Sequence, residues 1–265
     1  LLNRDVAEQI VAEVQGRPGK ISESRFRDRP EAPPLPLSLS ALQIEAGKLY
    51  RMGAKEVLDT AQALYERHQL ITYPRSDCRY LPEEHHGQAG QVIRAVSRVA
   101  QPLEPLTEGL DTARRSAAWN DKKVDAHHAI IPTSRATANG KLTAAEGKIY
   151  GLISRYYLMQ FADHAVHREG RLTVAILQHR FRATETALLQ PGWKALEVRQ
   201  KDEPADARKP PLPRLEKQEP VLCDRADIRE RTTQPPSHFT DATLLSAMTN
   251  IARFVADPEL RKTLR

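Results

Sequence analysis

The sequence is poor in cysteine, which excludes several kinds of small secreted and metal-stabilised protein. Its 265 residues include two cysteines, Cys78 and Cys223, which lie far apart with no second Cys or His at ligand spacing beside either. A disulfide framework or a zinc module is therefore not expected. The sequence also lacks an apolar run long enough to cross a membrane and a basic-then-apolar signal segment. We expect a cytoplasmic protein with no membrane partner.

The chain is not short of apolar or charged residues, and it carries a small positive excess. Apolar residues make up 40% of the sequence and charged residues 28%, which excludes a disordered chain. Lys and Arg number 40 against 34 Asp and Glu, a formal charge of +6. This excess mildly favours a polyanionic partner such as nucleic acid, although a plain basic surface would have the same composition.

Hydrophobic spacing in the first part of the chain predicts helices around one strand. Residues 3–15 have the pattern of an amphipathic helix with Asn3 as N-cap, and residues 20–28 alternate like a strand. The proline-rich segment 30–36 cannot join a helix or a central strand, so it predicts an extended, hinge-like domain boundary. Further helices are expected at residues 40–53, 54–69 and 82–100.

The second half of the chain changes from helical to alternating spacing. Thr143, with Glu146 three residues later, has the capping-box signature and opens a predicted helix over 142–161. After residue 165, alternation predicts antiparallel strands. The remaining expected elements are strands at 168–178, 179–190 and 220–234, a charged proline-rich loop at 201–213, and a helix at 238–255 capped by Thr240.

This order predicts an α+β multidomain protein in which a helical domain is inserted into a β-containing one. The expected parts are the first section of the β-rich domain (1–37), the helical domain (38–165), returning strands (166–234) and the start of a further helical domain (235–265).

One short motif, LITYPRSD, places three reactive side chains on constrained backbone. Pro74 pushes Tyr73 into an extended conformation, and alternate side chains of an extended segment share a side, so Tyr73, Arg75 and Asp77 should face the same way. A phenol of ordinary pKa near 10 is a poor nucleophile at neutral pH unless nearby positive charge lowers that pKa. A guanidinium would do so, and it also binds phosphate. The motif suits attack on a phosphodiester, and it also suits a structural Tyr beside a local Arg–Asp pair.

A second motif, KKVDAHHAIIPT, carries two histidines and two lysines. Adjacent His127 and His128 cannot face the same way on extended backbone, so a two-ligand metal site is not expected. Each is either a satisfied core or surface histidine or a donor to a phosphate oxygen. Lys122 and Lys123 would contact phosphates or form a solvated basic turn.

Aromatic residues near these motifs offer stacking surfaces for bases if they are exposed. Trp119, Tyr80 and Tyr65 are the candidates. Tyr65 follows Leu64 in a predicted helix and is spaced like a core residue, so we expect it to be buried.

The two motifs occur in this order about fifty residues apart, and together they resemble the type IA DNA topoisomerases. The string LITYPRSDCRYLPEEH is most similar to the bacterial topoisomerase III branch. PPLPLSLSALQ before the motifs and RTTQPPSHFTDATLLSAM after them also fit, so the resemblance spans nearly the whole chain.

The resemblance implies a nucleophilic Tyr73 that attacks one DNA strand. The product would be a 5′-phosphotyrosyl link that persists while another strand passes, after which the free 3′-hydroxyl reseals the break. Arg75 matches the family Arg that contacts the scissile phosphate, and His127 matches the position beside that phosphate. No ATP is implied, in agreement with the lack of a Gly-rich loop ending in GK[ST].

The roles of the other motif residues are less defined by the resemblance. Asp77 belongs to the first motif, and His128 lies at a position that varies in the family. We place both with Lys122 and Lys123 among the expected DNA contacts.

The family resemblance also implies parts that this sequence lacks. An N-terminal Toprim domain supplies a Glu, a Lys and an Asp-x-Asp cluster that holds Mg²⁺, and no such cluster occurs here. A TDGLGTEATRA-like segment is missing as well. We therefore expect a central gate fragment, with a helical nucleophile domain inserted into a β-rich arch domain. Its partners would be single-stranded DNA and the missing N-terminal domain, with Mg²⁺ only in the full-length parent and no metal in this fragment.

Two other interpretations remain open for the fragment. It could be a non-catalytic single-stranded DNA-binding or scaffold module, or a purely structural helical domain with a basic face. The resemblance favours a piece of an active enzyme that is inactive alone but binds DNA.

Overall fold

The computed structural model describes residues 3–198 and 211–264, which form two compact units. The sheet unit contains the described residues up to Glu31, then Ala165–Pro191 and residues 211–236. The helical unit contains Ala32–His164 with residues 192–198 and 237–264. The helical unit is thus inserted between two strands of the sheet unit. Most of the loop predicted at 201–213 lies outside the described residues.

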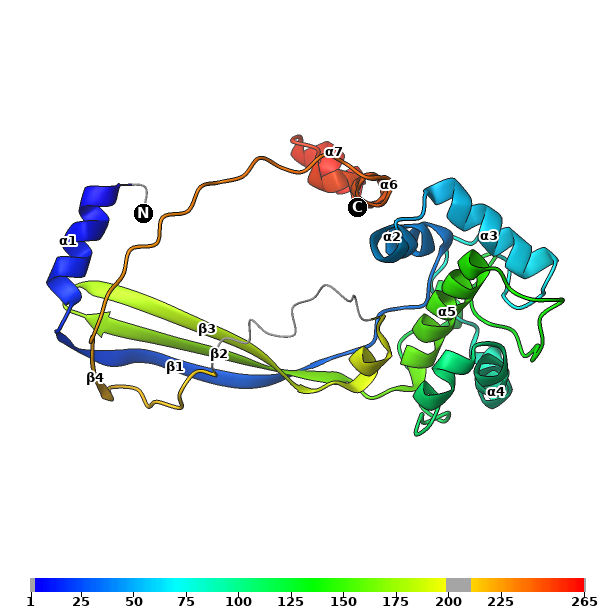
Figure 1. The fold of residues 1–265 in the computed structure, drawn as a ribbon, viewed down its shortest axis with the longest axis horizontal. Helices are drawn as coiled ribbons and strands as arrows, with labels where there is room; N and C mark the ends of the chain where they lie inside the picture. The colour runs from blue at the N-terminus through cyan, green and yellow to red at the C-terminus, as the bar shows by residue number, and fades with distance from the viewer. Residues whose placement is uncertain (1–2, 199–210, 265) are drawn as a thin grey trace. The chain divides into compact units, whose positions relative to one another are not determined.

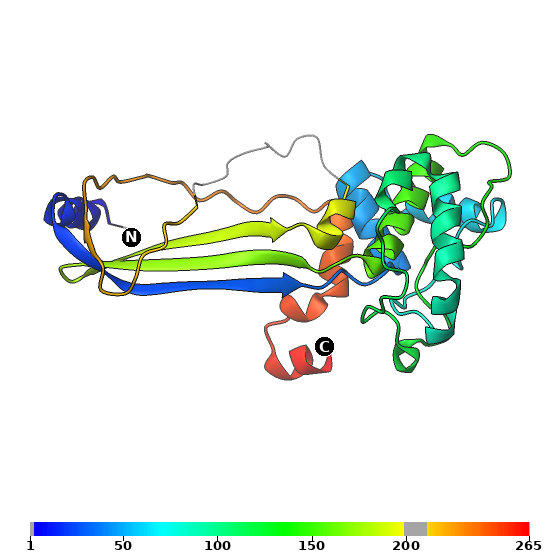
Figure 2. The same cartoon turned by 90° about the horizontal axis from the view of Figure 1, so that it is seen from below.

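The sheet unit is a long antiparallel ribbon of three strands with a short fourth strand (Figures 1 and 2). Its strands are β1 (Pro18–Glu31), β2 (Ala165–Ile176), β3 (His179–Gln190) and β4 (Pro220–Leu222), in the order β3-β2-β1-β4. β2 and β3 form a hairpin whose two-residue turn begins at Leu177, which has a positive φ of 53°.

Two strand predictions differ from the structure in length. β1 continues to Glu31. Pro30 pairs with Val166 of β2, but β4 pairs only with Pro18–Lys20, so β1 is an edge strand at Pro30, where proline is tolerated. The strand expected at 220–234 ends at Leu222. Most residues that follow it are exposed and half of those up to Gln234 are charged, so they have no apolar face to bury in a sheet.

Helix α1 (Arg4–Val14) confirms the prediction at the start of the chain. The Asn3 side chain caps it, accepting hydrogen bonds from the backbone N–H groups of Asp5 and Val6. Glu13 joins α1 to the β2–β3 turn through His179, whose Nε2 lies 2.7 Å from the carboxylate. α1 is therefore held at the turn end of the ribbon (Figure 1).

The helical unit contains four main helices and a C-terminal pair. These are α2 (Leu39–Tyr50), α3 (Ala54–Glu66), α4 (Ala89–Val99), α5 (Ala144–Leu158), α6 (Asp241–Thr249) and α7 (Pro258–Thr263). Short 3₁₀ turns connect them: η1 (Glu83–Gln88), η2 (Gln101–Leu106), η3 (Asp121–Lys123), η4 (Met159–Phe161), η5 (Gly192–Leu196) and η6 (Ile251–Arg253). The helix predicted at 82–100 is thus a 3₁₀ turn followed by α4. No described helix is long and apolar enough to span a bilayer.

The core of this unit lies among α2, α3 and α5. Leu42, Val57, Leu64, Ile149 and Ile153 are completely or almost completely buried in one cluster. Burying side chains of this size contributes about 1.5–3 kcal/mol each. The loop that carries Tyr73 leaves α3 directly from this rigid core.

The capping box at the start of α5 confirms a second sequence prediction. Thr143 Oγ1 accepts from the N–H of Glu146, and the Glu146 carboxylate accepts from the N–H of Thr143 at 2.8 Å. Arg67 and His68, at the end of α3, contact the same buried carboxylate. Burial alone would raise the pKa of Glu146, but the hydrogen bonds from Thr143 and the charge of Arg67 outweigh it and hold that pKa low.

Helix α6 packs on α2 at a glycine. A Cβ atom added to Gly47 would lie 2.8 Å from the Cβ of Ala242, so the close approach requires glycine at this position. This contact places α6 in the helical unit, and whether 235–265 begins a further domain stays a prediction.

Candidate active site

The two sequence motifs are paired side by side in the helical unit. The N–H of Thr72 donates to the carbonyl of Ile131 at 2.9 Å, and the N–H of Thr133 donates to the carbonyl of Leu70 at 2.9 Å. An antiparallel bridge joins Ile71 to Pro132 between them. The residue before Tyr73 and the residues after His128 therefore form one short β-like pair.

The hydroxyl of Thr72 adds a second link between the motifs. It donates to the carbonyl of Ala129 at 3.2 Å and accepts from the N–H of Ile131 at 3.0 Å. Because Ala129 and Ile131 are buried, water does not readily replace these bonds. Thr72 thus fixes the distance between Tyr73, the next residue, and the histidine pair.

Side chains of the first motif alternate between the surface and the core. Tyr73, Arg75 and Asp77 are exposed, whereas Ser76 and the neighbouring Pro74 are buried. This is the arrangement expected from an extended segment preceded by the Tyr–Pro peptide. The phenol, the guanidinium and the carboxylate face solvent on one side.

Tyr73 lies between two other rings. The His127 ring is 4.6 Å from it between centroids with a 43° tilt, and the Tyr65 ring meets it edge-on at 5.7 Å. Tyr73 is 36% exposed and Tyr65 37%. The expected burial of Tyr65 is wrong, because α3 turns Val57 and Leu64 into the core and the 100° step after Leu64 takes Tyr65 to the surface.

Arg75 is not neutralised by a carboxylate. Its Nε is 3.4 Å from Oε1 of Gln62, whose amide nitrogen in turn donates to Glu66 at 2.6 Å. Within residues 3–198 and 211–264, no ion pair involves Arg75 or Asp77. A local Arg75–Asp77 pair is therefore not seen, and the guanidinium has donors available for an anion.

The two histidines of the second motif have different neighbours, as expected for adjacent residues. His127 contacts Tyr73, whereas His128 donates from Nδ1 to its neighbouring carbonyl on Ala129 at 2.7 Å and meets the His85 ring edge-on. Burial lowers the pKa of His128, and the nearby imidazoles of His85 and His127 also lower it. The hydrogen bond to the Ala129 carbonyl raises the pKa of His128, but burial outweighs it, so that pKa stays below the ordinary histidine value.

A cavity of about 260 Å³ lies beside Tyr73 on the histidine side. His85, His127, His128 and Asp125 are among the residues that line it. Across the part of the chain that the structure describes, no group of three or more His, Cys, Asp or Glu side chains is placed to hold a metal ion. Mg²⁺ has no fitting donor set among these described residues.

The two candidate lysines lie at the edge of this region. Lys123 Nζ donates to the Tyr80 hydroxyl at 3.1 Å and lies over the Tyr80 ring. Lys122 is exposed in η3. Val124 and Asp125, which follow directly, line the histidine cavity, so both lysines are close to the site in the chain.

Sequence reasoning missed three residues that the structure brings to Tyr73: Gln62, Thr72 and His85. Gln62 and Thr72 act through hydrogen bonds to motif residues, and His85 supplies a ring at the cavity. Gln62 lies three residues before Tyr65 on α3, and because the sequence predicted a buried Tyr65, it gave no signal that Gln62 would reach the motif.

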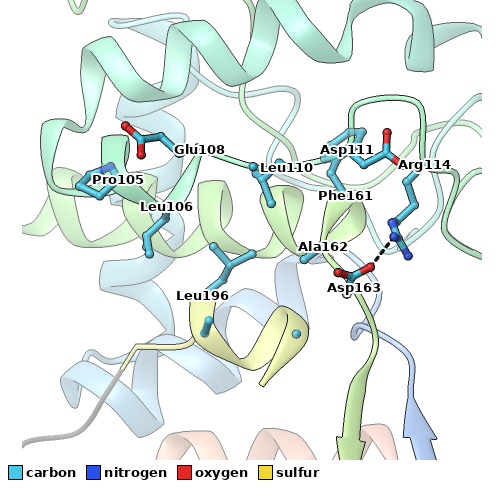
Figure 3. A pocket seen from close by; sticks show the side chains of 13 residues that line it. Pro105, Leu106, Glu108, Leu110, Asp111, Arg114, Phe161, Ala162, Asp163 and Leu196 are labelled. Carbon is cyan, nitrogen blue, oxygen red and sulfur yellow. Dashed lines mark hydrogen bonds and ion pairs between the residues drawn. The ribbon is translucent and has the colours of Figure 1, made fainter. Parts of the chain in front are cut away.

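A separate hollow lies elsewhere in the helical unit and contains no motif residue (Figure 3). Its volume is about 280 Å³, and apolar Leu106, Phe161 and Leu196 line it together with the ion pair of Arg114 and Asp163, whose atoms are 2.5 Å apart. No nucleophile lies beside a base there. This hollow therefore offers no second candidate for the chemistry at Tyr73.

Comparison with known proteins agrees with this site. A family model described as DNA topoisomerase matches residues 1–252. The chain therefore belongs to the DNA topoisomerases, in the type IA class that its motifs resemble.

Two relatives indicate which branch of the DNA topoisomerases this chain resembles. The chain is 47% identical to DNA topoisomerase 3 of Vibrio cholerae over 99% of its own length and 40% of that protein. It is 32% identical to DNA topoisomerase 3 of Bacillus licheniformis over 99% of this chain and 37% of the relative. The chain thus spans about 40% of the length of curated relatives such as these.

A solved structure shows the same fold. Full-length topoisomerase I from Thermotoga maritima is similar over 100% of this chain and 42% of its own, with a TM-score of 0.67 and 20% identity. At that identity the likeness concerns the fold, which in both is a mixed arrangement of helices and sheet.

Proposed function

We propose that this chain supplies the strand-cleaving tyrosine of a type IA DNA topoisomerase. Tyr73 oxygen attacks a phosphorus of single-stranded DNA, a Tyr–O–P bond forms, and the P–O3′ bond breaks. Tyr73 gives up its phenol proton as it attacks, and the departing 3′-oxygen takes up one proton and leaves as a hydroxyl, so the net step transfers one proton. Attack by that hydroxyl reverses the step and releases Tyr73, so the bond energy is kept without ATP.

The proposal rests on the groups that surround the Tyr73 phenol. Its phenol is exposed between two rings, Arg75 shares its side of the backbone without a carboxylate partner, and His127 lies against it. Fixed positive charge and a hydrogen-bond donor are the groups that stabilise a phosphorane-like transition state. Arg75 binds the phosphate, and His127 donates to one of its oxygens or to the departing oxygen.

The rest of the chain serves strand passage in this proposal. The helical unit is the nucleophile domain, and the β-ribbon is the arch from which it moves, with the proline-rich segment 30–36 as hinge. Asp77, His128, Lys122 and Lys123 contribute contacts to the DNA around the cleaved phosphate. A Toprim domain outside this chain supplies Mg²⁺, and the enzyme acts where DNA is found, in the cytoplasm.

A purified sample of residues 1–265 tests the DNA-binding part of the proposal. We expect weak binding of fluorescein-labelled oligothymidylate, with an affinity that falls steeply as salt rises because phosphate contacts release counterions. Relaxation of a supercoiled plasmid is not expected from this chain alone. Fluorescence anisotropy at several salt concentrations and a plasmid gel measure the two. Mg²⁺-dependent relaxation by residues 1–265 would show that the separate metal domain is unnecessary.

A non-catalytic single-stranded DNA-binding module is the second candidate. The same observation supports this candidate, because Arg75 beside the exposed Tyr73 would bind a phosphate even if Tyr73 did not attack it. Tyr73→Phe separates the two: cleavage in a complete enzyme disappears, whereas binding to single strands is kept.

A further inference from the structure

Exposed large apolar or aromatic side chains are rare on the main body of the helical unit. Among residues 32–164 and 192–198, Tyr65 and Tyr73 are the two that are exposed. These two touch each other, with ring centroids 5.7 Å apart. Aromatic rings gain free energy when they are buried, so a lone exposed pair points to a partner that covers it.

The pair lines a cavity that is larger than the histidine cavity. Its volume is about 570 Å³, and its polar and aromatic lining comes from Tyr65, Glu66, Gln69, Thr72, Tyr73 and Thr133. We call it the tyrosine pocket. Its volume lies inside the range of about 300–1,000 Å³ that is usual for bound small organic groups, whereas the histidine cavity falls below that range.

A hydrogen-bond acceptor and a hydrogen-bond donor line the tyrosine pocket. The Glu66 carboxylate accepts from Gln62 through one oxygen, which leaves the second oxygen as an acceptor. Gln69 accepts from Arg135 at 2.7 Å through its side-chain oxygen, so its amide nitrogen remains a donor. A donor and an acceptor beside an aromatic ring are the features that recognise the edge and the face of a nucleobase.

The backbone at Gln69 is held in a rare conformation. Its φ is +55°, and its carbonyl accepts from the Thr133 hydroxyl at 2.8 Å. A non-glycine residue costs about 1–3 kcal/mol in such a region and persists where surrounding contacts enforce it. The second motif therefore holds Gln69 at this edge of the pocket.

We infer that the tyrosine pocket binds the base of the first nucleotide of the strand that becomes attached to Tyr73. This inference rests on the proposed function, because the 5′-phosphate bonded to Tyr73 tethers that nucleotide within one residue of the ring. Its base stacks on Tyr65, while Arg75 and His127 hold the phosphate that is bonded to Tyr73. Tyr65 is thus a substrate-positioning residue that retains the tethered strand during strand passage.

The test uses residues 1–265 and 5′-phosphorylated octathymidylate probes with a 3′ fluorescein. Probe one has a base at its first nucleotide, and probe two is abasic there. A third, unlabelled probe carries 2-aminopurine at the first nucleotide, and a fourth carries it at the fifth. Tyr65→Leu removes the ring, and Tyr65→Phe is the matched control that keeps it. Because the side chain is exposed, both variants should fold, which thermal melting checks.

We expect Tyr65→Leu to weaken binding of probe one about tenfold, the usual effect of losing one base–aromatic stack. Binding of the abasic probe should not change, and Tyr65→Phe should match the parent chain on every probe. Fluorescence of 2-aminopurine should be quenched at the first nucleotide and not at the fifth, and Tyr65→Leu should abolish the quenching.

Two results would overturn the inference while leaving the proposed function intact. One is equal loss of affinity for the base-containing and abasic probes, which would mean that Tyr65 only supports Tyr73. The other is tight binding of probe one with unquenched 2-aminopurine at the first nucleotide. Failure of every probe to bind the unmodified chain would instead overturn the proposed function, and the inference with it.

Discussion

Replacing Thr72 with valine should uncouple the two motifs at a known free-energy cost. Valine keeps the shape of threonine but removes the hydroxyl that the N–H of Ile131 donates to at 3.0 Å. Ile131 is 5% exposed, so its N–H would lose a partner in a place that water does not reach easily. The Ala129 carbonyl keeps the bond from His128 and suffers less.

One unsatisfied buried backbone donor costs about 1–3 kcal/mol, so we expect Thr72→Val to lower the free energy of unfolding by about 2 kcal/mol. For a unit of this size, that corresponds to a fall in Tm of about 4–8 °C. Differential scanning calorimetry measures it. Thr60→Val is the matched control, because the Thr60 hydroxyl donates only to the exposed helical carbonyl of Glu56. The control should cost less than about 0.5 kcal/mol. Equal shifts in the two variants would refute the role given to Thr72.

Three further changes probe other parts of the structure. Arg75→Ala should weaken single-strand binding about tenfold and reduce its salt slope by about one, as anisotropy measures, with exposed Arg94→Ala as control. Stability should fall as pH drops from about 6.5 towards the lowered folded pKa of His128, because burial keeps this imidazole neutral while the unfolded chain binds a proton. His128→Gln should remove that part of the slope in pH-dependent melting, and an unchanged slope would contradict the assignment. Gly47→Val should release α6, since the added Cβ meets Ala242, and limited proteolysis should then cut near α6 sooner than in the parent chain.

Local chemistry in the sequence was sufficient for several features of the site. Pro74 restricts Tyr73 to extended backbone, and the alternation of exposed Tyr73, Arg75 and Asp77 follows from that single restriction. The capping box of Thr143 and Glu146 likewise sets the start of α5 through two local hydrogen bonds. These features involve residues within four positions of each other, where propensity and hydrogen bonding act directly.

Features that depend on distant contacts were not predictable in this way. Thr72 and Ile131 pair across nearly sixty residues, and no pattern in either segment specifies that register. The exposure of Tyr65 depends on which side of α3 meets α5, and its helical spacing with core residues wrongly predicted burial. The strand expected after Leu222 stops because β1 pairs only with Pro220–Leu222 of this segment, and that register is set by the sheet.

The central claim, that Tyr73 is the nucleophile, is tested most directly in a complete enzyme. Residues 1–265 would replace the matching segment of Vibrio cholerae DNA topoisomerase 3, to which this chain is 47% identical. End-labelled single-stranded DNA is then incubated with the chimera and run on a denaturing gel, and mass spectrometry locates the attached nucleotide. We predict an adduct on Tyr73 that disappears in Tyr73→Phe, whose binding to single strands is unchanged. An adduct that persists in Tyr73→Phe, or that maps to another residue, would contradict the account.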